Sequence, residues 1–397
     1  MDFTPTEGQA AARDLAARIF GDLSTHERLA AAGPGSDAEL WKTLCESGLV
    51  SAVEDIGLLG LVLLLEEQGR TTAQVPFAAS CVYGLLAVSA HGSAEQRERL
   101  LPDIGGGTVV VTGALPEAAV RVDARGELSG TVAVVPWLRD ATHVLVADDE
   151  RRLWLVRTAD AQCEPVELTA PWSAGRLTLD GTPAERLGPS TGSARDEGGD
   201  GRVYGGAVHG GVMHDGDAAR RPSPAVRDDR VRDDSVHDDR ARDARVYDDV
   251  LATARTAFAG VQAGVCAGSL ARAVEHTNTR EQFGRPLAVK QGVQLRAADA
   301  YMDTEAIRVT AYEAAWRRDE GLEYGTHALT AAWWASEAGQ RVVHTGQHLH
   351  GGMGADLDHP VHRHFLWGRQ LDAYLGCGSE VLQELGELIV QGEEGDA

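Results

Sequence analysis

The chain has 397 residues, of which 43% are hydrophobic, enough for a large core or for two to three domains. Its 37 basic and 60 acidic side chains give a formal net charge of −23, which argues against nucleic acid or an anionic membrane as the main partner. The longest apolar run, Leu58–Leu65, is too short to span a bilayer, and no secretory signal is evident. The five cysteines are scattered without a C-x-x-C pair, so we expect reduced, buried thiols and a cytoplasmic location.

Residues 1–105 are predicted to form an N-terminal helical domain. Thr4, Pro5 and Glu7 match a helix start, with Thr4 as the capping residue and Glu7 completing a capping box. Apolar residues then recur with a helical period over Ala10–Phe20. Further helices are expected over Ala38–Ser47, Gly57–Gln68 and Ser93–Leu101.

Residues 106–189 are predicted to form a small, barrel-like β-domain. Short β-branched runs alternate there with Gly, Asp and Pro at intervals typical of hairpins. The expected strands are Thr108–Thr112, Thr131–Val135, Thr142–Ala147, Arg152–Arg157 and Arg176–Leu179.

Residues 190–247 are predicted to be a disordered, low-complexity insertion. Gly, Asp, Arg and Ser dominate, and a five-residue repeat begins at Val226 with Val-Arg-Asp-Asp-Arg. A period of five matches neither a helix nor a strand, so its valines cannot line one face. With so little apolar surface, ordering cannot offset a conformational entropy cost of roughly 1–2 kcal/mol per residue.

Residues 248–397 are predicted to form a C-terminal four-helix bundle. Val250–Asn278 is Ala-rich and apolar on more than one face, as a buried bundle helix requires. Three further helices are expected over Gln291–Arg317, His327–His344 and Ser379–Val390. The fold class is therefore α+β, with the order helical domain, β-domain, helical bundle.

Two motifs in the bundle carry the functional information. The first runs from Arg280 to Gln291 as REQFGRPLAVKQ, and the second runs from Gln347 to Gly354 as QHLHGGMG. An anionic pyrophosphate needs a guanidinium group and closely approaching backbone N–H groups. Arg280 provides the first, and Gly351 and Gly352, which lack a Cβ, permit the second.

This pair resembles the flavin-holding motifs R-x-x-F-G-x-P-L-x-x-x-Q and Q-x-x-G-G-x-G of the acyl-CoA dehydrogenase family. The resemblance implies the same three-part fold and an FAD cofactor. It also implies oxidation of an acyl-CoA to the 2,3-enoyl-CoA, in which a carboxylate removes the α-proton and the flavin takes the β-hydrogen as hydride. By resemblance, six residues would contact the flavin nucleotide of a neighbouring subunit. They are Arg280, Phe283, Gln291, Gln347, Gly351 and Gly352.

The sequence departs from this family at the catalytic base. The family most often places its Glu directly before a Gly-Thr, and Leu375 occupies that position here. A minority of members carry the Glu on the helix before the first motif, and that position is Ala254. Neither side chain can accept a proton, so we assign no catalytic residue in this chain. The family's T-E-P-x-x-G-S-D and W-I-[ST]-N segments are also replaced, by residues 113–120 and 134–137.

Heteromeric family members that act on CoA thioesters of steroid side chains combine a subunit bearing the Glu with one lacking it. The sequence resembles the Glu-lacking type, which predicts a hetero-oligomer, a heterotetramer by that resemblance, with a homologous, Glu-bearing partner. Two alternatives stay open: a diverged enzyme that acts on an acyl-CoA without flavin, such as a hydratase, and a non-catalytic scaffold subunit. The sequence does not specify the acyl group.

Other candidate sites are weaker. His344 and His348 are one helical turn apart and could share a zinc ion, but no H-E-x-x-H accompanies them and the second motif already includes His348, so we predict no metal site. Asp372 and Glu380 lie close to Leu375 in sequence. On a helix neither would project from the position of Leu375, so we interpret both as surface charges.

Overall fold

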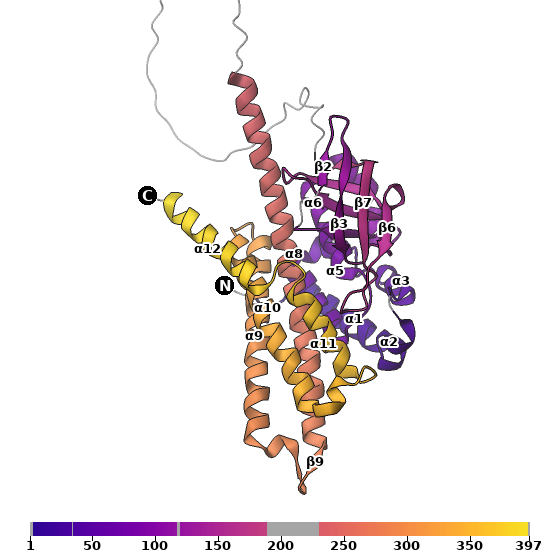
Figure 1. The fold of residues 1–397 in the computed structure, drawn as a ribbon, viewed down its shortest axis with the longest axis vertical. Helices are drawn as coiled ribbons and strands as arrows, with labels where there is room; N and C mark the ends of the chain where they lie inside the picture. The colour runs from indigo at the N-terminus through magenta and orange to yellow at the C-terminus, as the bar shows by residue number, and fades with distance from the viewer. Residues whose placement is uncertain (1–2, 34, 117–119, 189–229, 396–397) are drawn as a thin grey trace, which may run out of the picture.

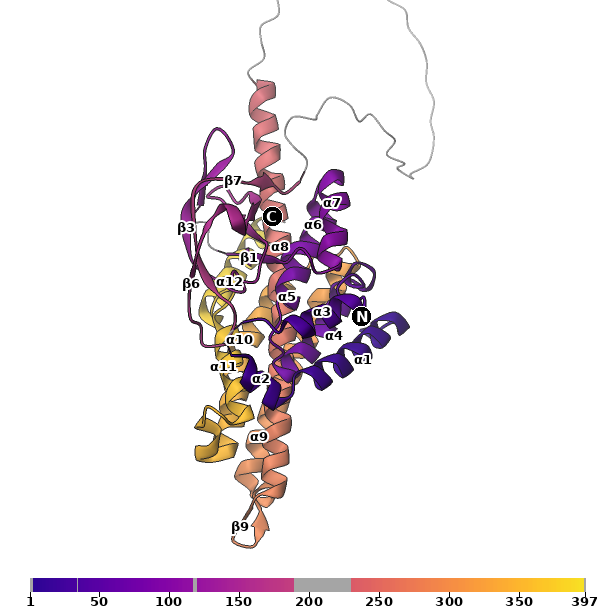
Figure 2. The same cartoon turned by 90° about the vertical axis from the view of Figure 1, so that its right-hand side faces the viewer.

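The computed structural model describes residues 3–33, 35–116, 120–188 and 230–395, and within the last range it describes the side chains of 239–390. It has the three-part α+β organisation that the sequence predicts. Helices of the N-terminal part pack against the C-terminal bundle, and the β-strands lie beside the bundle above them (Figure 1). A quarter turn shows the helix α1 crossing in front of the bundle (Figure 2).

The N-terminal part contains only helices in its described residues. They are α1 (Glu7–Leu23), α2 (His26–Ala32), α3 (Ala38–Glu46), α4 (Val53–Thr71), α5 (Phe77–Ala79), the π-helix η1 (Ser80–Leu86), α6 (Ala87–His91) and α7 (Ala94–Gly105). The predicted cap of α1 is wrong by two residues, because Thr6 caps the helix and forms the capping box with Gln9. Both arrangements satisfy local sequence rules, and in the fold Gln9 also donates to the carbonyl of Ile56.

The middle part consists of two four-stranded sheets. One has the order β1 (Val111–Ala114), β4 (His143–Ala147), β5 (Leu153–Arg157), β8 (Glu185–Arg186). The other has the order β2 (Val120–Val122), β3 (Glu127–Val135), β7 (Gly175–Pro183), β6 (Gln162–Pro165). Valines and leucines from both sheets form one shared core, and a bridge between Val120 and Asp148 joins the sheets at one point. The five strands that the sequence predicted correspond to β1, β3, β4, β5 and β7.

The C-terminal part is a bundle of long helices. It contains α8 (Arg230–Thr279), α9 (Gln291–Asp319), α10 (Gly325–His350) and α11 (Pro360–Asp372), followed by α12 (Gly378–Gly395). Helix α8 is the central helix, in contact with α9, α10, α11 and also α4. Gly264 allows α8 and α4 to cross closely, because a Cβ there would lie 2.1 Å from the carbonyl oxygen of Glu66. Glycine at the crossing lets the backbones touch and fixes the N-terminal part on the bundle.

The prediction of disorder over 190–247 is wrong for its last part, because α8 begins at Arg230. Residues 189–229 lie outside the described residues. Asp243 forms an ion pair with Arg186, and the buried Tyr247 donates its hydroxyl to the carbonyl of Pro116 at 3.0 Å. A helix already nucleated in the bundle can be extended without a new nucleation cost, which local composition cannot reveal.

Two expectations about the surface can be compared with the fold. All five cysteines are free, but Cys163 is exposed, so the prediction that every thiol is buried is wrong for that residue. Among the described residues one stretch, Asp239–Thr279 of α8, is long and apolar enough to cross a membrane. Since 78% of its most apolar window is buried inside the fold, it has the properties of a core helix.

Candidate functional site

The first motif forms a hairpin at the far end of α8. Arg280 follows the helix, and β9 (Glu281–Gln282) pairs with β10 (Arg285–Pro286). The side chain of Phe283 at its tip is 97% exposed, and the ammonium group of Lys290 lies 5.7 Å from its ring centre. Arg280 is exposed, and no described carboxylate forms an ion pair with it. The guanidinium group therefore has no structural partner of opposite charge within the described part of the chain.

The second motif lies beside this hairpin. Helix α10 ends at His350, and Gly351 follows with a φ of +65°, a conformation that favours glycine. The ring of His350 stacks on that of His276 with 4.7 Å between centres, and His276 is one helical turn before Arg280. The fold thus brings together two motifs that are about sixty residues apart. We call this region the hairpin end of the bundle: residues 276–291 and 347–354.

Within the hairpin end, the predicted site residues are accessible and only lightly committed. Gly351 and Gly352 are exposed, and a Cβ added to either would meet open space. Gln291 is exposed at the start of α9, and Gln347 donates to the carbonyl of Gly354 at 3.2 Å. Burial, followed by the neighbouring His350, lowers the pKa of His276. This end therefore offers one guanidinium group and open glycine backbone, a donor set that suits a pyrophosphate.

The positions where the resemblance places a base are apolar and buried. Leu375 is 6% exposed, and Ala254 on α8 is completely buried. The cavity beside Leu375 measures only about 20 Å³. Arg255 lies next to it, donating from Nε to the Leu375 carbonyl at 3.3 Å and from both Nη atoms to Glu384 at 2.7 and 2.8 Å. We call Ala254, Arg255, Leu375 and this cavity the base region.

Nearby carboxylates are bound to other groups. Asp372 accepts from the hydroxyl of Ser336 at 2.6 Å and pairs with Arg369 at 2.9 Å. Its side chain is 15% exposed, so its interpretation as a surface charge is wrong. Glu380 is exposed and accepts from the backbone N–H of Cys377 at 3.0 Å. Neither carboxylate lines the cavity beside Leu375.

Five aromatic side chains fill the space between the β-domain and the base region. Trp137 stacks on Trp172 with 5.8 Å between centres, and Trp172 meets Trp367 and Tyr374 edge-on at 5.4 and 6.0 Å. Tyr374 in turn lies 4.7 Å from Phe258 of α8. The three tryptophans are each at most 2% exposed. We call these residues the aromatic bridge; sequence reasoning identified only Trp137, because the other rings come from distant segments.

Known proteins match this chain over nearly its whole length. Residues 6–108 match the acyl-CoA dehydrogenase N-terminal domain and residues 244–385 match the C-terminal domain. Acyl-CoA dehydrogenase FadE27 of Mycobacterium tuberculosis is 30% identical over 422 residues, covering 98% of this chain and 99% of that protein. The chain belongs to the acyl-CoA dehydrogenase family. Acyl-CoA dehydrogenases are FAD-dependent flavoproteins that oxidise acyl-CoA, so the recognised family and its cofactor are confirmed.

Solved structures of the family include heteromers. A variant of the Tcur3481–Tcur3483 steroid ACAD superimposes with a TM-score of 0.80 at 36% identity, covering 98% of this chain and 99% of that one. The ChsE4–ChsE5 complex from Mycobacterium tuberculosis superimposes with a TM-score of 0.79 at 27% identity, with the same coverage. Both names describe complexes of two different chains.

The residues present fit FAD in one place and not in another. At the hairpin end, Arg280 and the open backbone of Gly351 and Gly352 suit the charge of a flavin nucleotide. In the base region, the aromatic bridge and the cavity of about 20 Å³ leave no room for an isoalloxazine ring beside Leu375.

Proposed function

We propose that this chain is the base-lacking subunit of an FAD-dependent acyl-CoA dehydrogenase hetero-oligomer. In that assembly a homologous partner supplies the catalytic Glu and the pocket for the flavin ring. The proposal rests mainly on one observation, the apolar and closed base region around Leu375 and Ala254. Oxidation across Cα–Cβ removes a proton and a hydride together, so a subunit without a base cannot carry out the reaction alone.

The nearby carboxylates do not replace the missing base. Glu384 is held by both terminal nitrogens of Arg255, and Asp372 by Ser336 and Arg369. Charge-assisted contacts of this kind favour the ionised carboxylate and fix its direction. Because none of these side chains lines the cavity beside Leu375, none could reach an α-proton there.

The hairpin end gives this subunit its positive role. We infer that Arg280 binds the pyrophosphate of the partner's flavin nucleotide and that Gly351 and Gly352 bring backbone N–H groups close to it. Phe283, Gln291 and Gln347 would complete this surface. When bound, the flavin accepts the β-hydrogen as hydride, while the residues of this chain bind and orient its nucleotide. The exposure of Phe283, at 97%, supports a role that requires a second chain.

The experiment compares the isolated chain with a complex formed by co-expression with a homologous, Glu-bearing subunit. The isolated, flavin-supplemented chain should give no dye reduction with acyl-CoA, whereas the complex should be yellow and bleach with substrate. A k_cat of ordinary size for the isolated chain, on the order of 1–10³ s⁻¹, would overturn the proposal. A colourless but active protein would instead support the non-flavin enzyme, and a yellow complex unchanged by loss of Arg280 would support a scaffold.

A further inference from the structure

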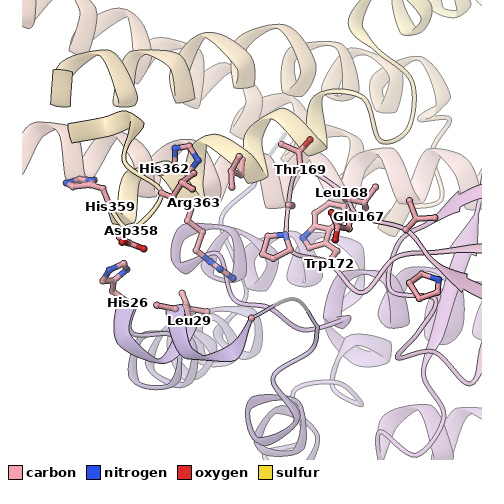
Figure 3. A pocket seen from close by; sticks show the side chains of 18 of the residues that line it. His26, Leu29, Glu167, Leu168, Thr169, Trp172, Asp358, His359, His362 and Arg363 are labelled. Carbon is pink, nitrogen blue, oxygen red and sulfur yellow. The ribbon is translucent and has the colours of Figure 1, made fainter. Parts of the chain in front are cut away.

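The largest described cavity outside the base region lies where all three parts of the chain meet. It measures about 700 Å³, within the range typical of small-molecule sites. Its walls come from α2, from the segment 165–172 between β6 and β7, and from 357–366 at the start of α11 (Figure 3). The exposed hairpin motif contributes nothing to it. The cavity is therefore separate from the nucleotide surface described above.

Two arginines line this cavity without a carboxylate partner among the described residues. Arg363 donates from Nε to Thr72 Oγ1 at 3.0 Å and from Nη2 to Gln74 Oε1 at 2.6 Å. Arg139 donates from Nε to the carbonyl of Ala174 at 3.1 Å. All of these acceptors are neutral. Burial lowers the pKa of Arg363 to about 10, which still leaves it charged at neutral pH.

The remaining lining is apolar, with one unsatisfied donor. Leu29, Leu168 and Leu366 contribute to the walls. Trp172 is 2% exposed, and its Nε1–H has no hydrogen-bond partner among the described residues. A buried donor left unpaired costs roughly 1–3 kcal/mol, so an acceptor brought by a ligand would remove that cost. The acidic lining residue Glu167 is exposed, so it can point to solvent when an anion enters.

We propose that this cavity binds an amphipathic carboxylate, with its head group at Arg139 and Arg363 and its apolar body against Leu29, Leu168 and Leu366. Guanidinium groups recognise carboxylates through charge-assisted hydrogen bonds, and the apolar walls then favour a ligand with a hydrocarbon body. The site goes beyond the proposed dehydrogenase function, because it needs neither flavin nor the partner subunit. Trp172 belongs to both the cavity and the aromatic bridge, so a bound ligand would contact the packing that closes the base region.

Binding is measured by calorimetry on the full-length chain with laurate as the probe. Dodecanol has the same hydrocarbon body without the anion, and acetate has the anion without the body. We expect laurate to bind at least tenfold more tightly than either. Equal binding of laurate and dodecanol, or no binding of laurate, would overturn the proposal.

Variants then locate the site. Arg139→Met should weaken laurate binding at least tenfold, while Arg125→Met, which removes the same charge from an exposed turn outside the cavity, should leave it unchanged. Leu366→Trp, which fills the cavity from α11, should also abolish binding at an unchanged melting temperature. Equal laurate affinity in the Arg139 and Arg125 variants would place the ligand elsewhere and overturn the assignment. None of these outcomes depends on dehydrogenase turnover.

Discussion

At the hairpin end of the bundle Phe283 is 97% exposed, whereas in the base region Leu375 is 6% exposed. The two regions lie along the same helix, since Ala254 and Arg280 are separated by 26 positions, or about 39 Å at 1.5 Å per residue. At one end the motif residues are present and the chain makes little use of them itself. At the other the side chain that the chemistry needs is absent, and core packing fills the space.

This contrast separates two kinds of constraint. Burial and dense packing explain Leu375, Trp172 and Trp367 without any function, because each contributes to the core or to ring contacts. Folding of the single chain does not explain an exposed Phe283 beside an Arg280 without an ion pair. Exposed groups with little structural work are where a partner or ligand is expected to act. Four experiments would break or sharpen this comparison.

The largest effect is expected from attempts to restore the base. Leu375→Glu in the isolated, flavin-supplemented chain should leave acyl-CoA dependent dye reduction at least about a thousandfold below an ordinary k_cat of 1–10³ s⁻¹. The base region has no room for substrate and flavin, and an introduced carboxylate would be buried against apolar neighbours. Leu375→Gln serves as the uncharged control in a thermal melt. Substantial turnover by the Glu variant would mean that the base region is open.

The next largest effect concerns the acid stability of α11, which connects the two regions. Burial lowers the pKa of His364 from 6.5 to about 4, although the carbonyl oxygens of Arg70 and Pro360 accept from its ring and oppose this shift. The unfolded chain therefore binds this proton more readily than the folded chain. His364 should thus reduce stability as pH falls from 6.5 to 4, by about 3 kcal/mol at 1.36 kcal/mol per pKa unit.

Denaturant unfolding between pH 7 and pH 4 measures this term. His364→Gln should flatten the pH dependence of the free energy of unfolding, while His348→Gln, at an exposed position of α10, should retain it. An unchanged slope in the His364 variant would show that another group controls acid unfolding.

At the hairpin end, Arg280→Ala should lower flavin retention by the assembled complex tenfold or more at an unchanged melting temperature. A guanidinium group on a pyrophosphate makes hydrogen bonds worth roughly 1.5–3 kcal/mol each. Arg280→Lys should rescue only part of the loss, since a point charge cannot grip two oxygens in one plane. The measurements are the flavin-to-protein ratio and the melting temperature.

Arg285→Ala provides the matched control for this experiment. Arg285 lies on the same exposed hairpin and carries the same charge, but the motif leaves its position free. Its loss should leave flavin retention unchanged. Equal flavin loss in both variants would indicate a general electrostatic effect, and full flavin retention in Arg280→Ala would remove Arg280 from the cofactor site.

The smallest effect is expected at the N-terminal extension of α8. Asp243→Asn should destabilise the protein by about 1 kcal/mol, because it breaks a partly buried ion pair with Arg186 of β8. Asp239→Asn, at an exposed position on the same helix, should change stability by less than roughly 0.5 kcal/mol. Equal and negligible effects would mean that the ion pair does not hold this part of α8 against the β-domain.

The sequence predicted much of the hairpin end and little of the base region's surroundings. Arg280, Gly351 and Gly352 were found because motif spacing is written in consecutive residues. The absence of a base at Leu375 and Ala254 was visible for the same reason. The closed cavity beside Leu375 was not, since Trp172 and Trp367 are almost two hundred residues apart and meet only in the folded chain. Trp137 was noticed, but only as the remnant of a segment.

By itself, the sequence determined the order of helical domain, β-domain and bundle, because hydrophobic periodicity is a local property of each segment. It also determined which end of the bundle could offer a guanidinium group and open backbone. Only the tertiary structure decided that α8 continues back to Arg230, that Thr6 rather than Thr4 caps α1, and that five aromatic rings close the base region. Each of these depends on contacts between residues distant in the chain, whose free energy no local pattern records.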